Sequence, residues 1–169
     1  MNNEKDIYSL SRLATEFVRE HFDPIIGKEQ NDYMLKKFQS VEGIKSQFDN
    51  GFEYYFLYLK DENQNIGFIG LCEEKKKLFF SKFYIKKEHR NKGYGKQAFE
   101  FIKNLAIKCN KESKYLTVNR NNTVTIQKYY RLGLKKVEER KTDSGKGYYM
   151  DDYILEYNIE CWVKSWLWA

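Results

Sequence analysis

The sequence has almost no proline and no stretch with the composition of a linker. Pro24 is the single proline among 169 residues, and no Gly/Ser-rich segment, internal repeat or low-complexity block interrupts the chain. Linkers between domains are typically rich in proline, glycine and small polar residues, so their lack argues against two domains. Hydrophobic residues make up 41% of the chain, enough for one sizeable core. We expect one domain over residues 1–157, followed by a tail over residues 158–169.

Cysteine and histidine are too few for a disulfide framework or a metal centre. The three cysteines, Cys72, Cys109 and Cys161, are an odd number at wide spacings. The two histidines, His21 and His89, are also far apart in the sequence. We therefore expect no metal. Cys72, at the end of a strand, and Cys109, on the apolar face of a helix, are expected to be core thiols that behave as small hydrophobes.

The sequence also lacks long apolar runs. No stretch is long enough to span a membrane, and no apolar segment follows the first six residues as it would in a signal peptide. These absences predict a cytoplasmic protein that has no membrane partner.

The charge balance is basic, with 30 Lys+Arg against 24 Asp+Glu and a net charge of +6. Such a balance fits a nucleic acid, a membrane surface or an anionic cofactor as partner. The chain has no RNP-like or zinc-knuckle motif, so an RNA-binding protein ranks last and no nucleic-acid partner is expected.

Residues 78–98 combine a buried strand, a glycine loop and the start of a long helix. Residues 78–85 are almost wholly aromatic, aliphatic or β-compatible, and a charged segment follows them. From Lys96 onward, apolar residues recur at helical spacing. A helix start presents unpaired N–H groups and the positive end of the helix dipole, and Gly93 and Gly95 would let an anion approach the main chain closely. This stretch therefore predicts an anion-binding loop.

The same glycines match two nucleotide-binding signatures only in part. The dinucleotide fingerprint G-x-G-x-x-A is matched by Gly93 to Ala98. That fingerprint needs its first glycine directly after the strand, whereas seven residues separate Ile85 from Gly93. It also needs an acidic residue where the next strand ends, and that strand ends in Asn119. A P-loop fails as well, because no Gly-Lys-Ser/Thr follows.

Two segments carry a more specific pattern. The first is Arg90-x-x-Gly93-x-Gly95, and the second, from Val118 to Leu134, runs strand, Asn-rich turn and short helix and ends in Tyr-x-x-x-Gly-Leu. At this separation they resemble the GNAT superfamily of acyl-CoA-dependent N-acyltransferases, whose signatures are Q/R-x-x-G-x-G/A and Tyr-x-x-x-Gly-Phe. The resemblance is close over residues 78–134, weaker over 7–72 and 135–157, and absent from 158–169.

The resemblance implies an α/β (α+β) fold in a single domain. Its sheet would be GNAT-like, mixed but mostly antiparallel, with about six to seven strands flanked by helices. The residues favour strands at 7–10, 52–60, 66–72, 78–85, 115–118, 134–141 and 148–157. They also favour five helices. The first is capped by Ser9 and stopped at Asp23-Pro24, and the others lie at 31–38, at 41–48, from 96 onward and after Asn122. Strand 115–118 is expected to pair in parallel after a crossover.

The resemblance also assigns the cofactor site. It implies that the strand ending at Ile85 meets the pantetheine arm of acetyl-CoA through main-chain groups, as an added strand does at a sheet edge. It implies that residues 91–96 bind the pyrophosphate and that Asn122 binds the lower part of the cofactor. The implied cofactor-binding residues are Phe83, Tyr84, Ile85, Arg90, Asn91, Lys92, Gly93, Tyr94, Gly95, Lys96 and Asn122.

Of the two groups that move protons, the resemblance supplies one. Tyr129, four residues before Gly133, stands where the family keeps its general acid. A phenol of pKa about 10 suits the protonation of a thiolate of pKa about 8.5. Ser81 and Thr117 stand where many relatives carry a Glu that acts as the general base, and neither of these two residues can act as a base. A water chain and the carboxylates of Glu53, Glu73 and Glu74 remain open alternatives.

These features predict an N-acetyltransferase that moves an acetyl group from acetyl-CoA to a primary amine of a small molecule or a protein by direct attack in a ternary complex. The helical N-terminal half and the strand Lys-Gly-Tyr-Tyr-Met-Asp-Asp-Tyr, residues 146–153, are loosely similar to bacterial polyamine-type acetyltransferases. The missing carboxylates motivate an alternative, a non-catalytic acetyl-CoA-binding sensor. Three tryptophans within residues 162–168 would leave a large apolar patch in water, so the tail is expected to pack on the core or on a second subunit of a homodimer.

Overall fold

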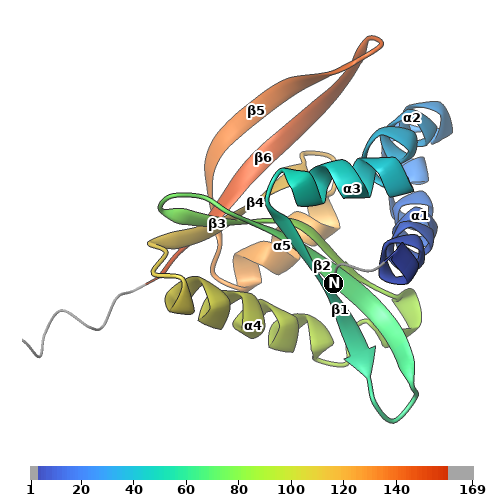
Figure 1. The fold of residues 1–169 in the computed structure, drawn as a ribbon. Coiled ribbons are helices and arrows are strands. Elements are labelled where there is room, and N and C mark those ends of the chain that lie inside the picture. The colour runs from blue at the N-terminus through green and yellow to red at the C-terminus, as the bar shows by residue number, and fades with distance from the viewer. Residues whose placement is uncertain (1–3, 160–169) are drawn as a thin grey trace, which may run out of the picture.

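A computed structural model describes residues 4–159 as helices packed on both faces of a six-stranded sheet (Figure 1). The helices are α1 (Glu4–Ile26), α2 (Lys28–Phe38), α3 (Val41–Asp49), the 3-10 turn η1 (Lys87–His89), α4 (Tyr94–Lys108) and α5 (Thr123–Arg131). The strands are β1 (Phe52–Leu59), β2 (Gln64–Glu73), β3 (Lys77–Ile85), β4 (Ser113–Asn119), β5 (Lys135–Gly145) and β6 (Tyr148–Asn158). Nearly all of the predicted tail, residues 160–169, lies outside the described residues.

The sheet has the strand order β1-β2-β3-β4-β6-β5. All neighbouring strands are antiparallel except β3 and β4, which are parallel. This confirms the expected mixed sheet, its β1-β2-β3 meander and the parallel crossover through α4. The last strand of the chain, β6, lies between β4 and β5, so the C-terminal hairpin joins the sheet by its second strand.

The N-terminal segment corrects the sequence prediction. Residues 7–10 are not a strand but part of the first turns of α1, and Ser9 lies inside this helix instead of capping it. The helix also continues past Pro24 to Ile26, because the ring removes only the hydrogen bond to Glu20 close to the helix end. The buried residues of α1 follow one helical stripe: Ile7, Leu10, Ala14, Phe17 and Val18.

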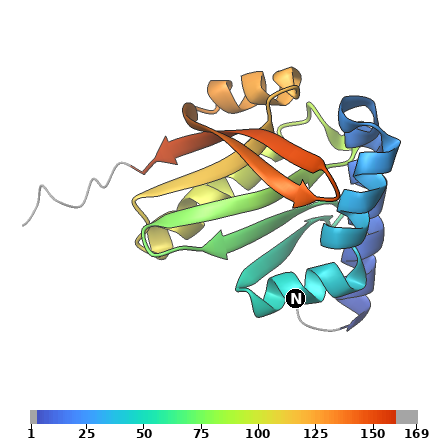
Figure 2. The same ribbon diagram turned by 90° about the horizontal axis from the view of Figure 1, so that it is seen from above.

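Two apolar clusters occupy the two faces of the sheet. One lies beneath α4 and α5 and includes Phe80, Phe99, Leu116, Val118 and Leu155. The other lies beneath α1 and α3 and includes Phe17, Ile44, Tyr54 and Phe68, with Tyr84 packed against them. Figure 2 shows α1, α2 and α3 grouped together beside the sheet, apart from α5. Within residues 4–159, no helix combines the length and apolar character that a membrane crossing requires.

The cysteines are not the core thiols that the sequence predicted. Cys72 and Cys109 are free and only half-buried. Cys109 caps the C-terminus of α4, where the helix meets solvent, and its Sγ donates to Glu73 Oε1 at 3.3 Å. Cys161 lies outside the described residues.

Candidate functional site

The sheet opens between its two parallel strands. β3 and β4 pair only at Lys77–Ser113, Leu78–Lys114 and Phe79–Tyr115, although β3 continues to Ile85 and β4 to Asn119. On its other side β3 stays paired with β2 up to Ile85. Over residues 80–85, the β4-facing edge of β3 therefore has no strand partner within the described part of the chain. Apart from the Ile85 oxygen, which accepts from Arg90 Nε, the main-chain donors and acceptors of this edge are available to a ligand that adds as a strand.

A β-bulge lies at the start of this open edge. Leu71 pairs with Phe80 and Gly70 with Lys82, so Ser81 has no opposite residue. A bulge bends its strand and changes the direction of nearby side chains. A Cβ at Gly70 would lie 2.9 Å from Lys82 Cγ, which shows that this glycine makes room for the Lys82 side chain. Lys82 Nζ donates to Ser81 Oγ at 3.0 Å, and burial lowers the pKa of Lys82 to about 8.

The loop at the other end of the open edge fits an anion. Gly93 is the N-cap of α4 with φ 86, and no side chain caps this helix end. Gly95 does not share the positive φ, and a Cβ there would meet only Ile85 Cδ1, at 3.7 Å. The fold itself would therefore accept a side chain at Gly95. Because Gly95 has no side chain, open space remains between the end of β3 and the N–H groups of the first helical turn. These N–H groups have no intrahelical acceptor.

Arg90, the first residue of the glycine signature, holds this loop in place. Its Nε donates to the main-chain oxygen of Ile85 at 2.8 Å, and its Nη1 lies 3.8 Å from Glu20 Oε1 of α1. The side chains of Asn91, Lys92 and Lys96 are exposed, and that of Tyr94 is half-buried. Binding of a phosphate by these residues stays a prediction.

Asn122 is engaged by a residue that the sequence analysis did not assign to the site. It is buried at the N-cap position of α5, and its Nδ2 lies 2.8 Å from His21 Nε2 of α1. Burial, and then the charge of Arg90, lower the pKa of His21. The pair joins α1 to α5 across 101 positions of sequence, so no local pattern could have revealed it. Its contact with a cofactor stays a prediction.

Tyr129 projects from α5 into the cluster beneath α4 and α5. Its ring packs edge-on against Phe80, with ring centroids 6.3 Å apart. Among residues 4–159, no group is hydrogen-bonded to its hydroxyl, yet the hydroxyl is not sealed from solvent. Burial, and then the phenol of Tyr84, raise the pKa of Tyr129, so the phenol keeps its proton at neutral pH.

A carboxylate absent from the sequence predictions lies near the same opening. Asp152 of β6 pairs in register with Asn119, the last residue of β4. Burial, and then the neighbouring Asp151, raise the pKa of Asp152 to about 6. Asp152 contributes in turn, after burial, to the raised pKa of Tyr84 on β3, so these two side chains are near neighbours. The sequence held one signal: consecutive aspartates on a strand face opposite sides of the sheet, so one of them faces a covered side.

The positions of Glu53, Glu73 and Glu74 argue against a role as base. Glu73 pairs with Leu78 at the far end of β3, about 20 Å of strand from Tyr84. Its hydrogen bond to Lys111 Nζ, which lies 3.0 Å away, lowers the pKa of Glu73. Glu74 accepts from the Tyr115 hydroxyl and Glu53 from that of Tyr55.

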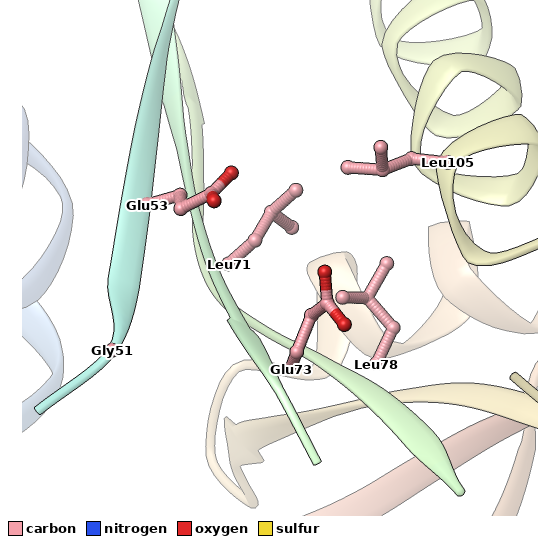
Figure 3. Close-up of a pocket in the computed structure, with 6 residues that line it drawn as sticks. All are labelled: Gly51, Glu53, Leu71, Glu73, Leu78 and Leu105. Carbon is pink, nitrogen blue, oxygen red and sulfur yellow. The ribbon is translucent and has the colours of Figure 1, made fainter. Parts of the chain in front are cut away.

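Glu53 and Glu73 line a separate small pocket of about 120 Å³. Figure 3 shows their carboxylates beside Leu71, Leu78 and Leu105. This pocket lies between the starts of β1 and β3 and the C-terminal half of α4, away from the glycine loop.

Comparison with known proteins gives a consistent result. A family model described as "Acetyltransferase (GNAT) family" matches residues 12–134, while the curated proteins give no match. The chain is similar to the PaiA N-acetyltransferase of Thermoplasma acidophilum in complex with coenzyme A, with 23% identity and a TM-score of 0.73 over 92% of this chain and 94% of that chain.

Two more solved structures share the fold. The chain is 16% identical to a GNAT-family acetyltransferase of Staphylococcus aureus, with a TM-score of 0.69 over 94% of this chain and 96% of that chain. It is also 16% identical to the dodecameric spermidine N-acetyltransferase of Vibrio cholerae, with a TM-score of 0.63 over 96% and 93%. At these identities the likeness concerns the fold alone.

Proposed function

Because this chain belongs to the acetyltransferase (GNAT) family, we propose that it transfers an acetyl group from acetyl-CoA to a primary amine, which attacks directly in a ternary complex. The observation that carries the proposal is the open edge of β3, which leads from the bulge at Ser81 to the glycine loop at Gly93. An extended ligand arm with an anionic end matches both parts of this site.

The residues of the chain fit acetyl-CoA in this position. The cofactor supplies an acetyl group activated as a thioester. The main chain of Phe83, Tyr84 and Ile85 would hold the pantetheine arm, and their N–H groups are the candidate donors to an oxyanion. Residues 91–96 would hold the pyrophosphate, with the missing side chain of Gly95 giving the room, and Asn122 would hold the lower part.

Tyr129 is the proposed proton donor. Its hydroxyl has no competing hydrogen bond among residues 4–159, and its raised pKa keeps the proton on Oη until a stronger base forms beside it. Tyr129 packs on Phe80, the residue immediately before the bulge, so it lies at the end of the open edge that is farther from the glycine loop.

We propose a small, polyamine-like primary amine as acceptor, with a protein amine as the second class. The hairpin of β5 and β6 is tied at its tip to α2, because Tyr33 Oη and Lys37 Nζ each donate to the main-chain oxygen of Ser144 at 2.7 Å. This contact joins α2 to the hairpin tip and so closes one side of the face of the sheet that the N-terminal helices cover. A closed side favours a small acceptor. The name of one similar structure, the spermidine N-acetyltransferase, supports the same class.

Two measurements test the proposal. Calorimetric titration should show that the protein binds coenzyme A. A thiol-release assay with acetyl-CoA and spermidine, putrescine, tyramine, free lysine or a lysine-containing peptide should then show turnover with at least one amine. Binding without turnover for any amine would favour the sensor, which the Ser81 and Thr117 positions motivate, and absence of binding would overturn the cofactor assignment.

A further inference from the structure

We propose that Asp152 is the general base that takes the proton from the acceptor ammonium, an inference that rests on the proposed function. The sequence offered no carboxylate at Ser81 or Thr117, and Glu53, Glu73 and Glu74 are engaged elsewhere. Asp152 lies at the open end of β4, on the last strand of the chain.

The alternation of side chains places Asp152 and the proposed acid on opposite faces of the sheet. Tyr153, the next residue on β6, packs with the cluster beneath α4 and α5, which also receives Tyr129. Asp152 therefore faces the other side, toward α1 and α3. Tyr84, whose pKa is raised by burial and then by the charge of Asp152, packs on this second side. Its ring centroid lies 5.3 Å from that of Phe68.

Within residues 4–159, the nearby arginines are engaged by carboxylates other than Asp152. Arg140, opposite Asp152 on β5, donates to Glu138 at 3.0 Å. Arg120, at the end of β4, lies 2.8 Å from Asp151 and 2.9 Å from Glu139.

Asp152 itself has no hydrogen bond or ion pair with any described residue. The uncharged groups that face it are Asn119, in register on β4, and the Tyr84 phenol of β3. A half-buried carboxylate without a counter-ion is costly to the fold and suited to an incoming ammonium.

The transfer uses Asp152 as the proton acceptor and Tyr129 as the proton donor. Asp152 accepts a proton from the ammonium, so that an N–H bond breaks and an O–H bond forms. The lone pair of the amine nitrogen then forms the new N–C bond with the acetyl carbon while the C–S bond breaks, and the sulfur takes a proton from Tyr129 Oη. The second proton that the nitrogen must lose to become an amide restores the Tyr129 phenol, so the products are the amide, the thiol and protonated Asp152. The raised pKa of Asp152, about 6, leaves it ionised at neutral pH and close to the value that suits a base there.

The test compares Asp152→Asn with Asp151→Asn, a matched change one residue away on the opposite face. It uses the full chain and the amine of the panel above that gives the highest rate. In the parent, kcat/KM should rise with pH and level near pH 7. In Asp152→Asn, kcat should fall by about 10²-fold or more at pH 7. The rate of this variant should keep rising toward the pKa of the amine itself, about 10.4 for a lysine-like amine. Asp151→Asn should keep a plateau, reached at a somewhat lower pH because the change removes a charge that raises the pKa of Asp152, and all three proteins should bind coenzyme A equally.

Thermal stability gives a second readout, which a purely structural role would move in the other direction. The folded state raises the pKa of Asp152, so ionisation of this group costs stability above that pKa. Asp152→Asn should therefore raise Tm at pH 8 by about 2 °C or more. Asp151→Asn should lower Tm because it removes the partner of Arg120.

The outcomes separate this inference from the function on which it rests. An active parent whose rate and pH profile are unchanged by Asp152→Asn overturns the base and leaves the acetyltransferase standing. A parent that binds acetyl-CoA but acetylates no amine overturns the proposed function, and the base with it. Loss of the plateau in Asp152→Asn alone, with a higher Tm, is the result we expect.

Discussion

Single residues at the opening of the sheet are distinguished by the partners they lack. Tyr129 and Asp152 are both at least half-buried, both have raised pKa values, and neither hydroxyl nor carboxylate is hydrogen-bonded within residues 4–159. A half-buried polar group without a hydrogen-bond partner adds little stability, because it is partly desolvated and gains no bond in return. These two positions are the ones proposed above for proton transfer.

Replacing Tyr129 with Phe should separate chemistry from binding. The change keeps the ring on Phe80 and removes only the proton, so kcat should fall by about 10²-fold or more. Coenzyme A affinity and Tm should hardly change, because no hydrogen bond is lost. Steady-state kinetics and calorimetry measure these effects, with Tyr130→Phe, an exposed neighbour on α5, as the control. Equal rates for both variants would rule out Tyr129 as the acid.

Lys114 of β4 is a buried cation far from the proposed chemistry. It is 0% exposed, its Nζ donates to the main-chain oxygen of Phe99 at 2.9 Å, and burial lowers its pKa to about 7. A pKa below that of the unfolded chain means that the charged form costs stability at low pH, and that this cost fades as pH rises from about 7 toward about 10.4.

Lys114→Met should accordingly raise Tm, by several °C at pH 6 and by much less at pH 10. Melting curves at the two pH values measure the difference. A uniform loss of stability would show that the hydrogen bond to Phe99 outweighs the burial of the charge.

At the scale of elements, the sequence predicted what local pattern controls. The apolar stripe of α4, the meander of β1 to β3 and the glycine loop each depend on neighbouring residues, and each was predicted. The strand expected at residues 7–10 was wrong because its apolar residues also fit the longer helical stripe of α1, which only the packing on the sheet selects. The pairing of His21 with Asn122 and the direction of Asp152 depend on contacts distant in sequence, which no local pattern contains.

The glycine loop yields a test at the second glycine of the signature. Gly93 has a positive φ, so a side chain there would strain the backbone, whereas Gly95 has no such constraint. Gly95→Glu should abolish coenzyme A binding by bulk and charge while Tm holds or rises, since Glu suits the first turn of a helix.

Calorimetry and melting measure both effects of Gly95→Glu. Gln97→Glu, which adds the same charge two residues on, should weaken binding much less. Full affinity in Gly95→Glu would exclude the loop as the pyrophosphate site.

At the scale of the whole molecule, α2 and the tip of the C-terminal hairpin hold the N-terminal helices to the end of the sheet. Tyr33 Oη reaches the main-chain oxygen of Ser144 across 111 positions of sequence, and its ring packs 5.5 Å from that of Tyr148. Gly145 allows this approach, because a Cβ there would lie 2.7 Å from the Tyr33 hydroxyl.

Loosening this contact should affect the acceptor side alone. Tyr33→Phe removes one half-buried hydrogen bond, a loss of about 1 kcal/mol that should lower Tm by roughly 2–4 °C. The KM for the amine should rise while coenzyme A affinity stays constant. Tyr8→Phe, on the exposed side of α1, serves as the control for melting and kinetics. An unchanged KM would show that the contact does not bound the acceptor site.

The place of β6 between β4 and β5 also orders events while the chain is being synthesised. The meander of β1 to β3 can pair as it emerges, but β4 lacks its antiparallel neighbour and β5 lacks any partner until residues 148–158 have left the ribosome. The glycine loop and Tyr129 therefore precede the strand that carries Asp152. A nascent chain would hold the residues proposed for the cofactor site before it holds the proposed base, so the set of proposed site residues is complete only when the last strand joins the sheet.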